Sequence, residues 1–304
     1  EHYKEKFKAK GTLPEKAGFD RHCLWQVEKL GNRFWGPTIR IDGQTKNFGK
    51  ETYGPDVYCQ FLLDRMEEYK DKPFFIYYPM ALVHSPFVPT PDSSDRNSKD
   101  KQRNFADMVY YMDKLIGKIV SKTEELGIAE RTLILVTGDN GTHTSIKSLM
   151  ENTIVQGGKG KTTDAGTRVG FFAYQPGNVP PGTVMDDLIE FSDILPTIAD
   201  ATGIKSTMPT DGRSFYPQLK GLEGNPRDSI YIYYWPRPEK GEPKAFVRNK
   251  RWKLYQTGEI YDLSNDIMEK NSISSQEVSD PIIQSLAKSL NQMPARGQSI
   301  LNFD

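Results

Sequence analysis

The chain has 304 residues, of which 37% are hydrophobic and 26% charged, and its 40 basic and 40 acidic residues cancel. This balance offers no basic surface of the kind that binds nucleic acid, and no apolar run approaches the roughly 18 residues of a membrane helix. Two cysteines, Cys23 and Cys59, are too few for a disulfide framework, and the sequence does not decide whether they pair. Composition therefore predicts a soluble globular protein that binds neither nucleic acid nor membrane.

A single hydrophobic core usually stops growing at about 250–300 residues, and this chain is slightly longer. Apolar runs at 74–78, 133–137 and 170–173 alternate with helical stretches, which is typical of an α/β fold. After residue 204 the apolar runs become short and are separated by Pro, Gly and Lys. We therefore expect an α/β domain at 1–204 and a smaller α+β subdomain at 205–304.

The first strand candidate, 74–78, runs into a proline-rich loop that carries His84. A histidine just past a strand end can act as an acid or a base near neutral pH. A lone histidine can equally be a structural hydrogen-bonding group. Residues 89–104 are rich in Pro, Asp, Ser, Arg and Lys, which predicts a long solvated loop beside His84. That loop either shapes access to a site or is only a polar surface.

The clearest predicted helix covers 105–125. Its apolar side chains recur at steps of three and four residues, which places them on one face directed at the core. They are Met108, Tyr111, Met112, Leu115, Ile116 and Ile119.

The run 133–137 ends in Gly138-Asp139-Asn140-Gly141. Consecutive apolar and β-branched residues suit a strand buried on both faces, as in a parallel sheet, and such sheets bind ligands at the carboxyl ends of their strands. Asp139 and Asn140 offer hard oxygen ligands that suit Ca²⁺ or Mg²⁺. Asp, Asn and Gly also favour turns, so a turn without a metal is the alternative.

A glycine-rich basic loop follows at 156–168, with Lys159 between Gly158 and Gly160. Such a loop can bring an ammonium group and backbone N–H groups to an oxyanion. The spacing of a Walker loop is absent. Further along, Asp193 is expected to cap a helix that Gly203 ends.

The last third predicts an antiparallel sheet of about four strands, from short runs at 230–235, 245–248, 252–256 and 259–263. A closing helix is expected at 281–290.

In their order and separations, the segments around His84, Asp139 and Lys159 resemble the sulfatase family of the alkaline-phosphatase superfamily. The resemblance covers nearly the whole chain. It implies an alkaline-phosphatase-like central sheet flanked by helices, with N-terminal strands missing, and a smaller C-terminal antiparallel sheet plus a helix. It extends through Gly18-Phe19-Asp20, Phe34-Trp35-Gly36-Pro37-Thr38, Tyr53-Gly54-Pro55-Asp56, Phe191-Ser192-Asp193-Ile194-Leu195-Pro196-Thr197, Asp211-Gly212-Arg213-Ser214 and Glu259-Ile260-Tyr261-Asp262-Leu263.

The resemblance also implies roles for individual residues. Asp139 and Asn140 match the second pair of calcium ligands, a site that could also take Mg²⁺. Lys159 matches the lysine that holds the sulfate and the leaving oxygen. His84 matches the histidine that contacts the ester oxygen and can protonate the departing alcohol. Asp164 stands where many members have glutamate, so we expect a supporting role there.

The family's nucleophile is not matched. In the family an early strand ends in two aspartates, followed by Cys or Ser-x-Pro or Ala-x-Arg, whose first residue matures to formylglycine. Neither Cys23 nor Cys59 begins that pattern, and no serine does. We expect the formylglycine in a segment upstream of Glu1, and the chain alone to be inactive and to need that segment or self-association. To hydrolyse an unactivated ester, an enzyme commonly lowers the activation barrier by roughly 8–23 kcal/mol. A general acid raises the rate by only about 10²–10⁴-fold, which cannot replace the nucleophile.

The function implied is hydrolysis of sulfate esters of sugars or aryl alcohols. A Ca²⁺-activated formylglycine oxygen would attack sulfur while His84 and Lys159 stabilise the leaving oxygen. A phosphoester or phosphonate hydrolase of the same superfamily and a non-catalytic carbohydrate-binding remnant are the alternatives. Phe34 and Trp35 are expected substrate contacts. Family habit implies a periplasmic or secreted location.

Overall fold

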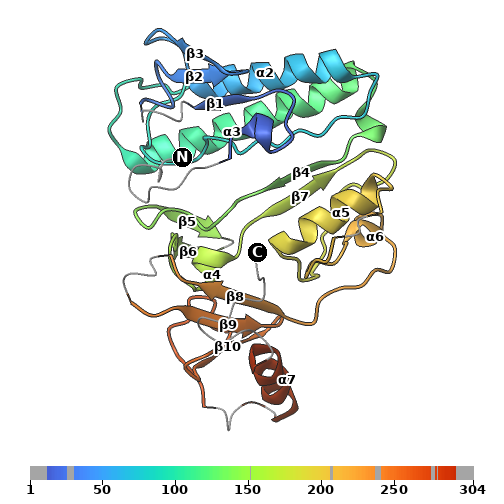
Figure 1. Cartoon of the computed structure of the whole chain (residues 1–304). Helices are drawn as coiled ribbons and strands as arrows, with labels where there is room; N and C mark the ends of the chain where they lie inside the picture. Colours follow the sequence, from blue (N-terminus) through green and yellow to red (C-terminus); the bar gives the residue numbers. More distant parts are fainter. Residues whose placement is uncertain are drawn as a thin grey trace. The chain divides into compact units, whose positions relative to one another are not determined.

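The structure, a computed structural model, describes residues 12–25, 31–150, 152–205, 208–236, 241–274, 278 and 280–291. The chain divides into two units, Glu1–Thr132 and Leu133–Asp304 (Figure 1), and each is described by itself. The expected change of domain after residue 204 stays a prediction. Among the described residues, no helix is both long enough and apolar enough to cross a membrane.

The first unit begins with a three-stranded antiparallel sheet of β1 (Cys23–Trp25), β2 (Thr38–Ile41) and β3 (Gln44–Asn47). Asp42 and Gly43 join β2 to β3 and both have positive φ, which a two-residue turn of this hand requires. The buried His22 ring accepts a hydrogen bond from Gly43 N at 3.1 Å, so this histidine serves the turn.

Two helices, α2 (Gly54–Tyr69) and α3 (Lys101–Glu125), lie side by side in this unit (Figure 1). The predicted apolar face of α3 is confirmed, since Met108, Tyr111 and Leu115 are at most 4% exposed. The helix begins four residues earlier than predicted because the Asp100 side chain accepts hydrogen bonds from Gln102 N and Arg103 N. The core of the unit also includes Phe34, Tyr53, Cys59 and Leu82.

The strand predicted at 74–78 is wrong. The segment has no regular secondary structure, and its backbone forms no hydrogen bond with the part of the chain that the structure describes. Its side chains still alternate as in a strand: Phe75 and Tyr77 are 61% and 67% exposed, whereas their neighbours are half-buried. The apolar alternation is real, but a strand also needs a hydrogen-bonded partner.

In the second unit, β4 (Ile134–Thr137) pairs with β7 (Phe171–Tyr174), which confirms both predicted strands. The pairing is antiparallel, with Thr137 opposite Phe171, so the expected parallel neighbour is wrong. The strand β4 is also half-buried and exposed at Thr137, so the expected burial on both faces is wrong. Among the described residues, β7 is its only strand partner.

Along the chain, the segment from β4 to β7 contains a hairpin and a short helix that we did not predict. The hairpin is formed by β5 (Lys147–Met150) and β6 (Thr153–Gln156), and the helix is α4 (Asp164–Thr167). The segment η3 (Phe191–Asp193) leads into α5 (Ile194–Ala201), and α6 (Tyr216–Leu219) follows.

Asp193 precedes α5 as predicted, but its side chain does not cap that helix. The carboxylate accepts hydrogen bonds from the Arg227 guanidinium at 2.9 Å, from Arg213 N at 2.7 Å and from Glu190 N at 2.9 Å. Burial acts to raise the pKa of Asp193, yet these hydrogen bonds hold it below its ordinary value. Gly203, with φ of 70°, follows the end of α5, as predicted.

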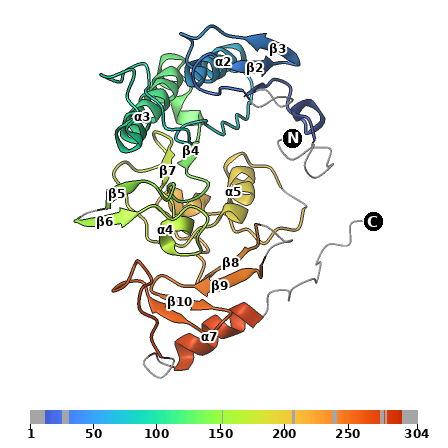
Figure 2. The ribbon, with the colours of Figure 1, turned by 90° about the vertical axis from the view of Figure 1, so that its left-hand side faces the viewer.

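The C-terminal part confirms the predicted antiparallel sheet and closing helix. The strand order is β11 (Ile260–Asp262), β10 (Trp252–Tyr255), β9 (Lys244–Arg248) and β8 (Ile230–Tyr234). The helix α7 (Asp280–Asn291) packs against β9 and β10 (Figure 2). Their shared core includes Val247, Leu254, Ile260 and Leu286.

Candidate functional site

The loop after β4 presents Asp139 and Asn140. Asp139 is exposed and Asn140 is half-buried. Neither side chain forms a hydrogen bond with the described residues, so the carboxylate and the amide oxygen are uncommitted. Thr137 Oγ1 anchors the start of the loop by donating to Gly170 O at 3.0 Å.

These two oxygens fit part of a calcium site. A Ca²⁺ ion takes six to eight oxygen ligands in proteins, and carboxylate and amide oxygens are among them. The described residues contain no group of three or more His, Cys, Asp or Glu side chains that could hold a metal. Asp139 and Asn140 are therefore two ligands of the hard type, and the remaining ones would come from elsewhere.

Lys159 lies in a tight turn after β6. Lys161 N donates to Gly158 O at 2.8 Å across the turn, and Gly160 has φ of 82°, a conformation that favours glycine. Lys159 N donates to Thr142 O at 2.9 Å. This bond ties the lysine loop directly to the loop of Asp139 and Asn140.

Glycines let the two loops approach backbone to backbone. A Cβ atom on Gly141 would lie 2.0 Å from Ala165 O, and one on Gly157 would lie 2.2 Å from His143 O, so both glycines sit where the loops meet. Within the lysine loop, one on Gly158 would lie 2.5 Å from Ala165 C. One on Gly166 would lie 2.2 Å from Lys161 O. Since real Cβ atoms do not approach other atoms this closely, only glycine fits at these positions. The metal-ligand loop and the lysine loop therefore form one unit, which we call the interlocked loops (138–143 and 157–168).

Replacing Gly141 with alanine should lower the free energy of unfolding by about 3 kcal/mol, because its Cβ meets backbone atoms of Ala165 in the other loop, which cannot rotate away. The control is Gly138→Ala, whose Cβ meets the Val169 side chain at an ordinary 3.5 Å. Denaturant unfolding of both variants measures the difference. Equal stability of the two variants would contradict the interlock.

Asp164 joins the loops to the C-terminal sheet. Its side chain is 2% exposed and accepts two hydrogen bonds from Arg248 Nη1, both at 2.8 Å. On β10, Lys253 Nζ donates to Thr162 O at 2.6 Å and to Glu269 Oε1 at 2.8 Å. Arg248, Lys253 and Glu269 could not be identified from the sequence, because charged residues usually face solvent.

His84 lies in the first unit, in the loop before α3. Its side chain is exposed, and Nδ1 donates to Ser85 O at 2.8 Å, since a carbonyl can only accept. This bond leaves Nε2 as the ring atom that can exchange a proton with a ligand. Asp139, Asn140 and Lys159 lie on the two hydrogen-bonded loops of the second unit, whereas His84 belongs to the first unit.

Of the two aromatic residues expected to contact substrate, Phe34 is only 3% exposed and packs in the core, so that expectation is wrong for Phe34. Trp35 is half-buried. Its Nε1 donates to Pro89 O at 2.8 Å, and the Arg96 guanidinium lies 4.1 Å from its ring centroid. The loop after His84 thus covers part of the Trp35 ring.

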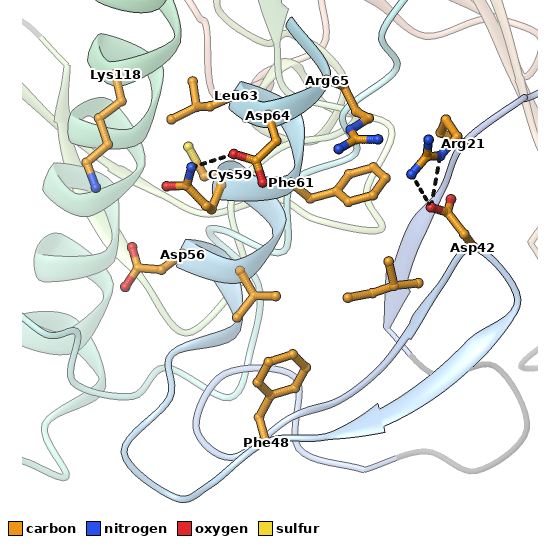
Figure 3. Close-up of a pocket in the computed structure, with 13 residues that line it drawn as sticks. Arg21, Asp42, Phe48, Asp56, Cys59, Phe61, Leu63, Asp64, Arg65 and Lys118 are labelled. Atoms are coloured by element: carbon orange, nitrogen blue, oxygen red, sulfur yellow. Dashed lines mark hydrogen bonds and ion pairs between the residues drawn. The ribbon is translucent and has the colours of Figure 1, made fainter. Parts of the chain in front are cut away.

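The first unit also holds an open cavity of about 570 Å³, lined by α2, the β2–β3 hairpin and Lys118 of α3 (Figure 3). Arg21 and Asp42 form an ion pair of 2.8 Å on its wall. His84 does not line it. Charges of both signs share the wall, so its chemistry favours no single class of ligand.

Neither cysteine has the properties of a nucleophile. Both are free thiols, and Cys59 is buried. Burial raises the pKa of Cys23 to about 12. The reactive thiolate is therefore scarce at neutral pH.

Comparison with known proteins yields two family matches. The profile of the Sulfatase family matches residues 3–204, and that of the "N-sulphoglucosamine sulphohydrolase, C-terminal" family matches residues 161–296. Arylsulfatase A of Homo sapiens is 32% identical over 202 residues, which are 65% of this chain and 39% of that protein. A sulfatase of Formosa agariphila is 25% identical over 301 residues, 88% of this chain and 52% of that protein. The chain thus spans about half, or less, of these relatives.

Solved structures agree in fold. Ps i-CgsB superposes with a TM-score of 0.76 at 24% identity, covering 92% of this chain and 67% of that one. BT4656, solved with its substrate D-glucosamine-2-N,6-O-disulfate, gives 0.71 at 16% identity, covering 90% and 76%. The expected alkaline-phosphatase-like fold is confirmed.

Proposed function

Because the chain belongs to the sulfatase family, we propose that the protein hydrolyses sulfate esters and that the interlocked loops bind the ester's sulfate group. The observation that carries the proposal is the contact between the two loops. It joins the backbone that carries Asp139 and Asn140, whose side-chain oxygens are uncommitted, to the backbone that carries Lys159. A cationic side chain and a metal ion can both stabilise the negative charge that develops on the oxygens of such an ester.

In the proposed reaction Lys159 binds a sulfate oxygen and the leaving oxygen, and stabilises the negative charge that develops as the S–O bond breaks. His84 gives a proton from Nε2 to the departing alcohol, because Nδ1 is committed to Ser85 O. Asp139 and Asn140 hold Ca²⁺, with Mg²⁺ as the alternative. When bound, this ion neutralises charge on the ester oxygens.

Within the 304 residues, neither Cys23 nor Cys59 begins the Cys or Ser-x-Pro or Ala-x-Arg pattern that matures to formylglycine. We therefore assign the nucleophile to a segment outside residues 1–304 and the activity to the whole protein. We expect residues 1–304 alone to be inactive. We propose a periplasmic or secreted location, because members of the sulfatase family are usually found there.

Sulfated sugars are the substrate class we favour. BT4656 was solved with a disulfated glucosamine, and Ps i-CgsB with k-i-k-neocarrahexaose. Aryl sulfates remain the convenient test substrates, since the leaving oxygen and the sulfate group are the same in kind.

The test compares initial rates on an aryl sulfate and the matching aryl phosphate, with the whole protein and added Ca²⁺. We expect kcat/KM for the sulfate to exceed that for the phosphate by about 10²-fold or more. The reverse preference would instead indicate a phosphoester hydrolase. Binding of a sulfated sugar without any turnover would indicate a carbohydrate-binding remnant.

A further inference from the structure

A buried cluster of charged and polar side chains lies directly beneath the interlocked loops. We call Asp164, Arg248, Lys253, Tyr255 and Glu269 the loop-support cluster. Asp164 begins α4, Arg248 ends β9, Lys253 and Tyr255 lie on β10, and Glu269 follows β11. The Lys253 side chain is fully buried, and those of Asp164 and Glu269 are 2% exposed.

The cluster binds the backbone of the lysine loop at two residues. Lys253 Nζ donates to Thr162 O at 2.6 Å, and the Tyr255 hydroxyl oxygen lies 3.2 Å from the same carbonyl. Glu269 Oε1 accepts from Asp164 N at 2.8 Å, and its Oε2 accepts from Tyr255 OH at 2.6 Å. Thr162 and Asp164 are therefore fixed from below by groups of the C-terminal sheet.

The charges within the cluster balance. Arg248 pairs with Asp164 at 2.8 Å, and Lys253 pairs with Glu269 at 2.8 Å. Burial lowers the pKa of Lys253, against the opposite effect of Glu269. Breaking one pair would leave an unpaired buried charge, which is strongly unfavourable. The cluster therefore holds a single arrangement.

Glu269 adds a sign of strain. Its φ is 51°, in the left-handed region that residues other than glycine seldom adopt. Such conformations persist where surrounding contacts over-determine them, often next to functional sites. Here the contacts are the hydrogen bonds of Glu269 to Asp164 N, Lys253 and Tyr255.

We propose that the loop-support cluster positions Lys159 for its contact with the substrate, by fixing the backbone three and five residues after it. Lys253 and Glu269 are positioning residues, since their buried side chains touch the loop backbone at Thr162 O and Asp164 N. The path is short: Lys161 N donates to Gly158 O across the turn, and Thr162 follows Lys161. The inference rests on the proposed function for the identity of the ligand, but the placement of the loop is independent of it.

The experiment compares Lys253→Met and Glu269→Gln in the whole protein. The matched control is Arg251→Met, which breaks an ion pair of 2.7 Å with Asp262 on the same sheet, where Arg251 is 54% exposed and does not touch the loops. Amide hydrogen exchange is followed in 158–166 and in β4 and β7. The turnover number kcat and the Michaelis constant KM are measured with an aryl sulfate.

In Lys253→Met we expect amides of 158–166 to exchange at least about tenfold faster, with β4 and β7 unchanged. We expect kcat to fall about 100-fold with a smaller rise in KM, as for a misplaced Lys159. Glu269→Gln keeps an oxygen that can accept from Asp164 N, so its losses should be smaller. Arg251→Met should behave as the wild type.

Equal acceleration of all amides of the second unit, or unchanged exchange in 158–166, would overturn the proposal, because either result assigns the cluster to general stability. If Lys253→Met does not fold, Glu269→Gln decides the same point. If the wild type turns over no sulfate ester, the proposed function fails, and hydrogen exchange still decides whether the cluster positions the loop.

Discussion

Replacing Lys159 with alanine should lower kcat/KM for a sulfate ester by about 10²–10³-fold. An ammonium group about 4 Å from a sulfate oxygen gains roughly 4 kcal/mol at an effective dielectric near 20. Since about 1.4 kcal/mol corresponds to a factor of ten, the upper bound is about three orders of magnitude. Part of this energy already acts in the substrate complex, so KM should rise while kcat falls.

The matched control is Lys161→Ala. Lys161 is exposed and lies two residues further along the same loop, so the variant removes the same charge from the neighbourhood. We expect kcat/KM to stay within about threefold of the wild type, as for an exposed charge. Similar losses of kcat/KM in the two variants would show that the effect comes from the overall electrostatic field of the loop. That result would contradict a specific role for Lys159.

Replacing Asp139 with asparagine should abolish tight Ca²⁺ binding and reduce kcat/KM by about 10³-fold or more at low Ca²⁺ concentration. A metal ion contributes several kcal/mol of charge stabilisation in such reactions. Asparagine keeps the shape and one oxygen of Asp139 but removes the negative charge that favours a divalent cation. Calcium titration followed by calorimetry measures the binding, and rates at several Ca²⁺ concentrations measure its consequence.

Excess Ca²⁺ should partly restore the rate of Asp139→Asn, because the amide oxygen still offers one ligand. The control is Asp186→Asn, which removes an exposed carboxylate from the same unit. It should leave both Ca²⁺ affinity and rate unchanged. Wild-type affinity in Asp139→Asn would place the metal, if one is used, at other residues.

Elements with a strong local pattern were predictable from the sequence. The helix α3 follows from the spacing of Met108, Tyr111 and Leu115, and the four-stranded sheet follows from short apolar runs between turn residues. In both, the local preference and the burial agree. The end of α3 that was misplaced depended on a single side chain, Asp100, whose capping bonds require the fold of the preceding loop.

Elements that depend on distant partners were not predictable. The segment 74–78 has the alternation of a strand, but a hydrogen-bonded neighbour decides whether it is one. Asp193 is a suitable cap by residue type, yet Arg227, 34 residues away, binds its carboxylate instead. The antiparallel partner of β4 likewise lies outside the local sequence.

For the candidate site, residue types and order were sufficient to propose Asp139, Asn140 and Lys159. The close approach of Gly141 and Gly158 to Ala165 could not be predicted from the sequence, because a glycine in a loop more often serves a turn. The burial of Lys253 could not be predicted either, since a lysine on a strand ordinarily faces solvent. Its full burial follows only from the loop that covers it.

The central claim is that the interlocked loops hold Ca²⁺ and the sulfate group together. The most direct test is a crystal structure of the whole protein grown with Ca²⁺ and a sulfated monosaccharide. We predict anomalous density for Ca²⁺ at about 2.3–2.6 Å from the Asp139 and Asn140 oxygens. We also predict a sulfate oxygen within about 3 Å of Lys159 Nζ. A metal and a sulfate group bound away from these three residues would contradict the account.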